Sequence, residues 1–152
     1  MGVAFQAFSL SPELFDSLMA DADAASSCVS SHYCKDEVGN GFEAVWLDKT
    51  GIGILEAFGM VSGDPDPVIS WMMNASVMSV GEEPSPCLTP EMMTSDVAEL
   101  IGPISDSDFA TRAQSNVIET EVDYLMWGFA ALRDLIVRAA AQGRGVLLYA
   151  SG

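Results

Sequence analysis

The last third of the sequence, residues 120–149, predicts one long amphipathic helix followed by a short strand. Gly143 supplies the expected end of the helix, and the apolar run Val146–Tyr149 has the length of a buried strand. Before that end, apolar residues recur every three or four positions and so share one helix face; they are Val122, Leu125, Phe129, Leu132, Ile136 and Ala139. We interpret this stretch as scaffold rather than as a site of chemistry.

The rest of the chain contains further signals for helix starts. A Ser or Thr cap followed by Pro at the first helical position marks two of them, at Ser11 and Thr89. A third is the capping-box variant that begins at Ser105. Asp48 has the chemistry of an N-cap for a helix ending near Phe58.

The remaining segments are harder to assign. Residues 3–8 alternate mildly and predict a first strand. Residues 23–40 are polar and aperiodic, which indicates a loop or a weak helix. Residues 68–80 predict either a short helix and then a strand or one buried segment. At 152 residues, with 49% hydrophobic and 18% charged residues, the chain predicts a single globular domain over residues 1–152.

Net charge is the most unusual feature of the composition. Six Lys and Arg residues face 22 Asp and Glu residues, which gives a formal net charge of −16. Such a surface repels nucleic acid and anionic membranes, because both are bound through Lys and Arg that neutralise phosphate. It attracts basic partners, although acidic residues also serve simply to keep a protein soluble. We expect a basic protein partner, no nucleic acid and no membrane.

The N-terminus and the cysteines favour a cytoplasmic location. Residues 1–5 contain no basic leader, and no stretch reaches the roughly 18 uninterrupted apolar residues of a membrane span. Cys28, Cys34 and Cys87 are an odd number of cysteines, which fits reduced thiols in a cytosol.

Four stretches together resemble the YfbM-like family, small bacterial proteins of unknown function. They occur in the expected order over nearly the whole chain and are Leu10–Glu13, Trp46–Lys49, Leu88–Glu91 and Val122–Tyr149. Members of that family commonly carry Trp-His where this chain has Thr50 and Gly51, so a histidine of the relatives is absent here. The resemblance implies a sheet covered by helices on both faces and no established activity.

These observations predict an α+β (α/β-like) fold. We expect a single YfbM-like domain with a mixed β-sheet flanked by helices. The long C-terminal amphipathic helix should be followed by a short terminal strand.

Asp48 and Lys49 are the first candidates for a ligand site. Lys49 is one of two basic residues before Arg112, and a buried Asp–Lys pair can orient a ligand or hold a catalytic lysine. Trp46 and Tyr149 are expected as walls of this site. The alternative is an N-cap Asp beside a Lys that extends into solvent, which is favoured because adjacent helical residues do not face each other.

The single histidine lies between two cysteines, in the pattern Cys28-x3-His32-x-Cys34. With Cys87 these residues have the donor types of a zinc site, but the spacing is not a usual zinc pattern. Small buried thiols and a loop histidine explain them better. The chain contains no Walker loop, nucleophile elbow or His-Glu-x-x-His. We expect no metal and no cofactor, and the catalytic residues, if the chain is an enzyme, are unknown.

Three functions follow from these features. The first is a non-enzymatic binding protein that uses its acidic surface, or a pocket near Trp46–Lys49, to hold a partner; an inhibitor or immunity-type protein for a basic partner is one version. The second is a small enzyme or ligand-binding domain with its site near Trp46–Lys49. The third, part of a homo-oligomer, predicts an exposed patch of Met and aromatic residues. The first function is compatible with a monomer or a homodimer. Most Met residues are expected in the core.

Overall fold

The structure, a computed structural model, describes residues 3–60, 63, 66–77, 87–116 and 121–151. The described residues form one antiparallel sheet of five strands in the order β2-β3-β1-β5-β4. The strands are β1 (Ala4–Leu10), β2 (Glu37–Gly39), β3 (Phe42–Asp48), β4 (Cys87–Thr89) and β5 (Gly145–Ser151). The first strand of the chain is therefore the central strand of the sheet, with the last strand beside it.

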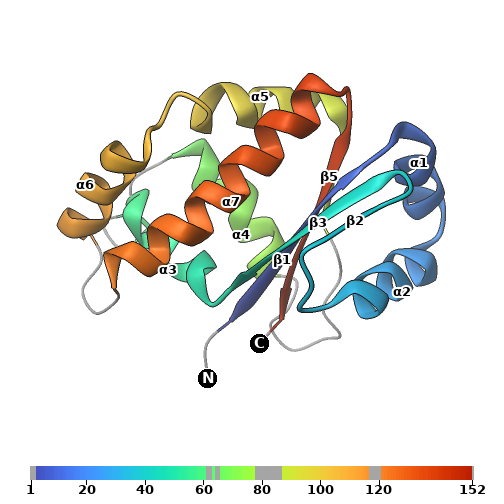
Figure 1. Cartoon of the computed structure of the whole chain (residues 1–152), viewed down its shortest axis with the longest axis horizontal. Coiled ribbons are helices and arrows are strands. Elements are labelled where there is room, and N and C mark those ends of the chain that lie inside the picture. Colours follow the sequence, from blue (N-terminus) through green and yellow to red (C-terminus); the bar gives the residue numbers. More distant parts are fainter. Residues whose placement is uncertain (1–2, 61–62, 64–65, 78–86, 117–120, 152) are drawn as a thin grey trace.

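Helices cover both faces of this sheet (Figure 1). One face carries α1 (Pro12–Ala20) and α2 (Ala22–His32). The other face carries α3 (Thr50–Ala57), α4 (Pro67–Val77), α5 (Glu91–Ile101), α6 (Asp106–Asn116) and α7 (Val122–Ala141). The predicted α+β fold with a long C-terminal helix and a terminal strand is confirmed. None of the described helices combines the length and the apolar character that crossing a bilayer requires.

Strand β1 divides the core in two, because side chains alternate between the faces of a sheet. Phe5 and Ala7 belong to the larger core under α7. Phe8 and Leu10 belong to the smaller core under α1 and α2. Every residue of β1 is buried, so the strand has no face exposed to solvent.

The predicted apolar face of α7 is confirmed, and it forms the centre of the larger core. The helix begins at Val122 and is followed by Gly143 in the left-handed conformation, with φ of 64°. That conformation is the usual reason for glycine just beyond a helix end. The buried residues of the face are Leu125, Phe129, Leu132, Ile136 and Ala139.

Glycines allow α3 and α7 to approach each other closely. A Cβ atom on Gly128 of α7 would overlap the side chain of Thr50, and a Cβ on Gly53 of α3 would overlap Leu125. Thr50 is fully buried, and its hydroxyl donates a hydrogen bond of 2.5 Å to the carbonyl oxygen of Leu47. Two glycines lower the intrinsic stability of α3 by about 1 kcal/mol each. Burial of this helix against α7 outweighs that loss.

Two of the predicted helix caps are confirmed. The Ser11 hydroxyl accepts a hydrogen bond of 3.3 Å from the Leu14 amide, and the Ser105 hydroxyl accepts one of 3.1 Å from the Asp108 amide. Each satisfies a backbone donor that the first turn of a helix leaves unpaired.

Two other predicted caps are wrong. Asp48 does not cap α3: the N-cap is Lys49, with no side-chain hydrogen bond. Thr89 does not cap α5, whose N-cap is Pro90. The Thr89 hydroxyl instead accepts a buried hydrogen bond of 2.8 Å from the Trp71 indole. In both cases the side chain forms a hydrogen bond with a distant aromatic residue and not with the helix start that the local sequence pattern predicts.

The polar segment 23–40 contains more regular structure than its composition indicates. The Asp21 carboxylate caps α2 by accepting hydrogen bonds from the amides of Asp23 and Ala24. The helix then runs to His32, which supports the weak-helix interpretation for the first part of the segment. Residues 67–77 form α4, and residues 78–80 of the predicted apolar segment lie outside the described part.

Replacing Gly128 by Ala tests the contact between α3 and α7. At an exposed helix position this change stabilises by about 1 kcal/mol, because Ala has the better helix propensity. Here we expect a loss of about 1–3 kcal/mol in the free energy of unfolding, the usual effect of overpacking a core. Urea denaturation followed by circular dichroism measures it. A variant as stable as the parent would show that the two helices have room for a methyl group.

Replacing Thr89 by Val tests the buried hydrogen bond to Trp71. Valine keeps the shape of threonine but leaves the indole N–H without an acceptor, so we expect a loss of about 1–3 kcal/mol in the free energy of unfolding. Thr111 is exposed on α6, and Thr111→Val is the matched control, with an expected change within about 0.5 kcal/mol. Equal losses in the two variants would contradict the role given to Thr89.

Candidate functional site

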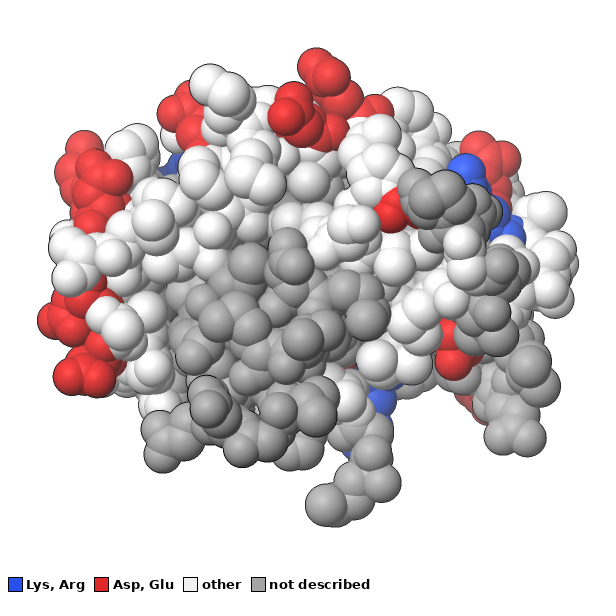
Figure 2. All heavy atoms as spheres, turned by 180° about the vertical axis from the view of Figure 1, so that it is seen from behind, with Lys and Arg blue, Asp and Glu red and all other residues white. Residues whose placement is uncertain are grey.

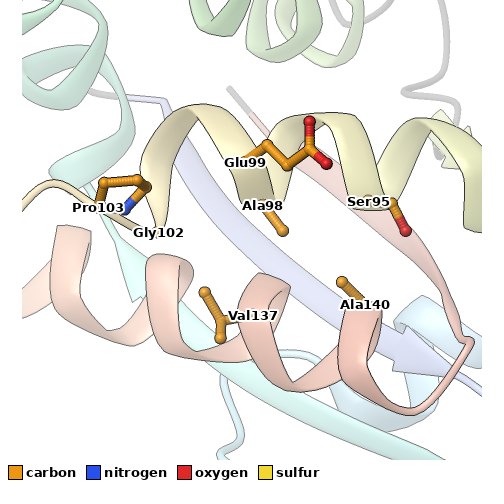
Figure 3. Close-up of a pocket in the computed structure, with 7 residues that line it drawn as sticks. All are labelled: Ser95, Ala98, Glu99, Gly102, Pro103, Val137 and Ala140. Atoms are coloured by element: carbon orange, nitrogen blue, oxygen red, sulfur yellow. The ribbon is translucent and has the colours of Figure 1, made fainter.

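A groove between α5 and α7 is the largest of the three cavities described here, with a volume of about 560 Å³. Figure 3 shows the side chains of Ala98, Val137 and Ala140 in the space between the two helices. The small residues Ala98, Gly102 and Ala140 leave this space open, and Pro103 follows the end of α5. The full lining is Ser95, Ala98, Glu99, Gly102, Pro103, Val137 and Ala140.

A second cavity of about 240 Å³ lies on the other side of α5, against α4. It includes Trp71, Met93, Asp96 and Leu100. A third, of about 200 Å³, lies between the start of α1 and the start of α5 and includes Phe15 and Glu91. Helix α5 therefore has a hollow along each side and one at its N-terminal end.

Large apolar side chains are exposed on and beside α5. The exposed fractions are 79% for Met92, 51% for Met93, 44% for Leu100 and 42% for Val137. Met92 lies one helical turn before Ser95, on the groove side of α5. The expectation that methionines fill the core holds for Met72, which is buried, but is wrong for Met92 and Met93. Contiguous exposed apolar surface marks a site of interaction more often than an accident of folding.

The carboxylates around this surface are not neutralised. Glu91, Asp96 and Glu99 are exposed on α5, and none of them forms an ion pair with a described residue. Figure 2 shows acidic side chains gathered along the upper and left edges of one face, with few basic side chains in view. Of the three acids of α5, Glu99 lines the groove, whereas Asp96 lines the second cavity and Glu91 the third.

The arginines of α7 are occupied by contacts within the chain. The Arg133 guanidinium donates hydrogen bonds to the Asp106 carboxylate at 2.6 Å and to the Asp134 carboxylate at 3.0 Å. The Arg138 guanidinium makes two hydrogen bonds to the Glu43 carboxylate of β3. These pairs hold α7 to α6 and to the sheet, and neither arginine forms an ion pair with an acidic side chain of α5.

Two of the predicted site residues, Trp46 and Tyr149, lie on the same face of the sheet as α2. Both are register partners of Gln6 in the central strand. Tyr33, which follows α2, makes edge contacts with both rings, at centroid distances of 5.1 Å to Trp46 and 6.4 Å to Tyr149. Burial and the neighbouring Tyr33 raise the pKa of Tyr149. The three rings form one partly exposed aromatic cluster.

The buried Gln6 side chain holds the segment that carries Tyr33. Its amide nitrogen donates to the Lys35 carbonyl at 3.0 Å, and its amide oxygen accepts from the Cys34 amide at 3.1 Å. Cys34 has a positive φ of 63°, a conformation that is uncommon for a residue with a side chain. Gln6 thus fixes a local conformation through both ends of its amide.

The other two predicted residues, Asp48 and Lys49, meet a different aromatic residue. The Asp48 carboxylate accepts a hydrogen bond of 2.5 Å from the Tyr124 hydroxyl, and the Lys49 amide donates one of 3.3 Å to the same hydroxyl. Burial, and then the hydrogen bond to Asp48, raise the pKa of Tyr124. The Lys49 side chain is exposed. Trp46 and Tyr149 thus share one aromatic partner, and Asp48 and Lys49 share another.

In the segment with the pattern Cys28-x3-His32-x-Cys34, the histidine contacts an acidic and an aromatic residue. The His32 ring contacts the Glu37 carboxylate at 2.6 Å and packs on Phe42. Burial raises the pKa of the Cys28 thiol. Among the described residues, no group of three or more His, Cys, Asp or Glu side chains is arranged to hold a metal ion. Cys87 belongs to β4.

Sequence reasoning missed Tyr33, Tyr124 and the exposed face of α5. Helix α5 carried a weak signal. Four of its large apolar residues follow one stripe at i, i+4, i+7 and i+8 spacing; they are Met93, Val97, Leu100 and Ile101. Met92 lies outside that stripe, so the pattern leaves at least one large apolar side chain off the core face.

The arrangement of helices and strands is similar to that of a solved structure, YfbM from Escherichia coli, a protein of unknown function. The TM-score is 0.54 and the sequence identity is 14%, with 95% of this chain and 98% of that chain covered. No family model matches the chain, and no curated protein matches it. The resemblance that four short motifs predict is confirmed at the level of the fold.

Proposed function

We propose that the protein is a binding protein that holds a basic, amphipathic helix of a partner protein in the groove between α5 and α7. The observation that carries this proposal is an open apolar groove that is lined by the exposed, unpaired carboxylate of Glu99, with two further unpaired carboxylates, Glu91 and Asp96, elsewhere on α5. In helix-in-groove recognition, the apolar groove binds the apolar face of an amphipathic helix. The acidic side chains then select a partner whose other positions are basic.

The dimensions of the groove support a helix as the occupant. A volume of about 560 Å³ accepts several apolar side chains spaced by one turn, and small residues on both walls allow close approach. Met92 on the groove side of α5 and Val137 on α7 are exposed apolar side chains that can pack against the incoming helix. Their exposure in the free protein is then explained by what they contact in the complex.

Charge supports a basic occupant. With a formal net charge of −16, the chain attracts cations over distances of about one Debye length, roughly 8 Å at physiological salt. Attraction of this kind speeds association and discriminates against acidic competitors. An inhibitor or immunity-type protein that masks a basic partner in the bacterial cytoplasm is the concrete form of this proposal, acting as a monomer or a homodimer.

A small enzyme or ligand-binding domain near Trp46–Lys49 is the alternative function. Lys49 is exposed, whereas lysines that act as nucleophiles are commonly desolvated in an apolar pocket. None of the three cavities described above includes Lys49.

Fluorescence anisotropy with designed helical peptides tests the proposal. The probe is a labelled 18-residue helix with Leu on one face and Lys and Arg on the other, compared with the same helix bearing Glu in place of Lys and Arg. We expect saturable, salt-sensitive binding of the basic probe only. Glu99→Gln should weaken binding about two- to fivefold, the effect of about 0.5–1 kcal/mol for one exposed charge.

Matched variants separate the groove from general attraction between opposite charges. Glu13→Gln removes an exposed carboxylate from α1. Unlike Glu99→Gln, it should leave the affinity equal to that of the parent protein. Val137→Ser should weaken binding about threefold or more through lost apolar contact. Val38→Ser, at a side chain 81% exposed on β2, should not. Equal effects within each pair would contradict docking in this groove.

A further inference from the structure

The segment that joins β3 to α3 contains an acidic side chain in an unusual position. Asp48 has a positive φ of 50°, a conformation that is uncommon for a residue with a side chain. Its carboxylate does not cap α3, which has no side-chain cap. One carboxylate oxygen accepts the hydrogen bond from Tyr124, and the other has no hydrogen-bond partner among the described residues. The structure thus fixes the direction of a carboxylate and leaves half of it available.

An exposed aromatic surface adjoins this carboxylate. The indole of Trp127 stacks on the Tyr124 ring with a centroid distance of 5.9 Å and an interplanar angle of 12°. Trp127 is 46% exposed and is not among the residues that pack against the larger core. Tyr124 therefore contacts Asp48 through its hydroxyl and Trp127 through its ring face. The three side chains form a continuous strip, which we call the Asp48–Trp127 strip.

The surrounding charge favours a cation. Lys49 is the basic residue next to this strip, and its exposed side chain forms no ion pair with a described residue. Against it stand the Asp48 carboxylate and two exposed acids at the start of α7, Glu121 and Asp123. A planar guanidinium matches such a strip better than an ammonium, because it can stack on an aromatic face while it donates hydrogen bonds to a carboxylate.

We propose that the Asp48–Trp127 strip is a binding site for a guanidinium group, of the kind that an arginine side chain carries. The Asp48 carboxylate accepts hydrogen bonds from the guanidinium, and the exposed aromatic rings supply the stacking surface. Tyr124 acts as a positioning residue, because its hydroxyl holds the carboxylate and its ring supports the indole. This site is separate from the groove between α5 and α7 and does not depend on it.

Titration followed by NMR tests the site. The chain has three tryptophans, so its ¹H–¹⁵N spectrum has three indole N–H signals, and Trp127→Phe identifies the relevant one. The probe is N-acetyl-arginine N-methylamide, and its control is the citrulline analogue, which has the same shape without the charge. We expect a saturable shift of the Trp127 signal with the arginine probe and at least fivefold weaker binding of the citrulline probe.

Two carboxylate variants give the decisive comparison. Asparagine tolerates a positive φ and can still accept the Tyr124 hydrogen bond, so Asp48→Asn should keep the fold while weakening arginine binding about tenfold, the loss of one charge-assisted contact. Asp123→Asn makes the same change of charge on α7 and should weaken binding less than twofold. Similar weakening in both variants, or equal binding of arginine and citrulline probes, would overturn the proposal.

The source of the guanidinium is resolved by a third probe. Free L-arginine carries an α-amino group and a carboxylate that the blocked arginine lacks. Equal affinity for free and blocked arginine would indicate that the site takes an arginine side chain of a protein. Binding of free arginine at least tenfold more tightly would indicate a small molecule. Absence of a Trp127 shift with either probe at 50 mM would refute the site.

Discussion

The close packing of α7 on the sheet and on α3 is the constraint on which the rest of the structure depends. Helix α7 contacts α3, α5 and α6 as well as strands β1, β3 and β5. Gly128 lets the backbone of α7 approach Thr50, and Arg138 fixes the helix to β3 through Glu43. A larger residue at position 128 would displace α7 from several elements together, because a packed core transmits a shift instead of absorbing it.

The exposed face of α5 is a consequence of this arrangement. Helix α7 already covers the centre of the sheet, so α5 packs beside α7 and against α4 and β5 at the margin of the core. Its inner residues, Val97 and Ile101, are buried, while Met92 and Leu100 are not. The sequence of α5 keeps apolar residues on both sides of the helix, which lowers solubility unless something covers them. The carboxylates between these apolar residues raise the solubility and also favour a basic partner.

The sequence predicted elements whose signals are local and failed where a distant residue competes for a side chain. The face of α7, the cap at Ser11 and the end at Gly143 each depend on neighbours within one or two turns, and all were confirmed. Asp48 has the chemistry of a cap, yet Tyr124, 76 residues away, takes its carboxylate. Such a contact cannot be predicted from hydrophobic periodicity, because periodicity indicates which face of an element is buried and not which polar groups form hydrogen bonds. The groove left little signal, because its walls carry small residues such as Ala98, Gly102 and Ala140.

The two proposed sites use one helix in two different ways. Trp127 and Val137 are ten residues apart on α7, which is about 15 Å along the axis of an α-helix and about 80° around it at 3.6 residues per turn. The rotation turns Trp127 away from the groove, so a single straight helix lying in the groove does not contact the Asp48–Trp127 strip, and a partner occupying both must present two separate contacts. Each contact then adds to the other through effective concentration, because α7 is held rigidly by the core beneath it. A partner that fills both sites therefore gains affinity from each contact, although each site binds its own ligand independently.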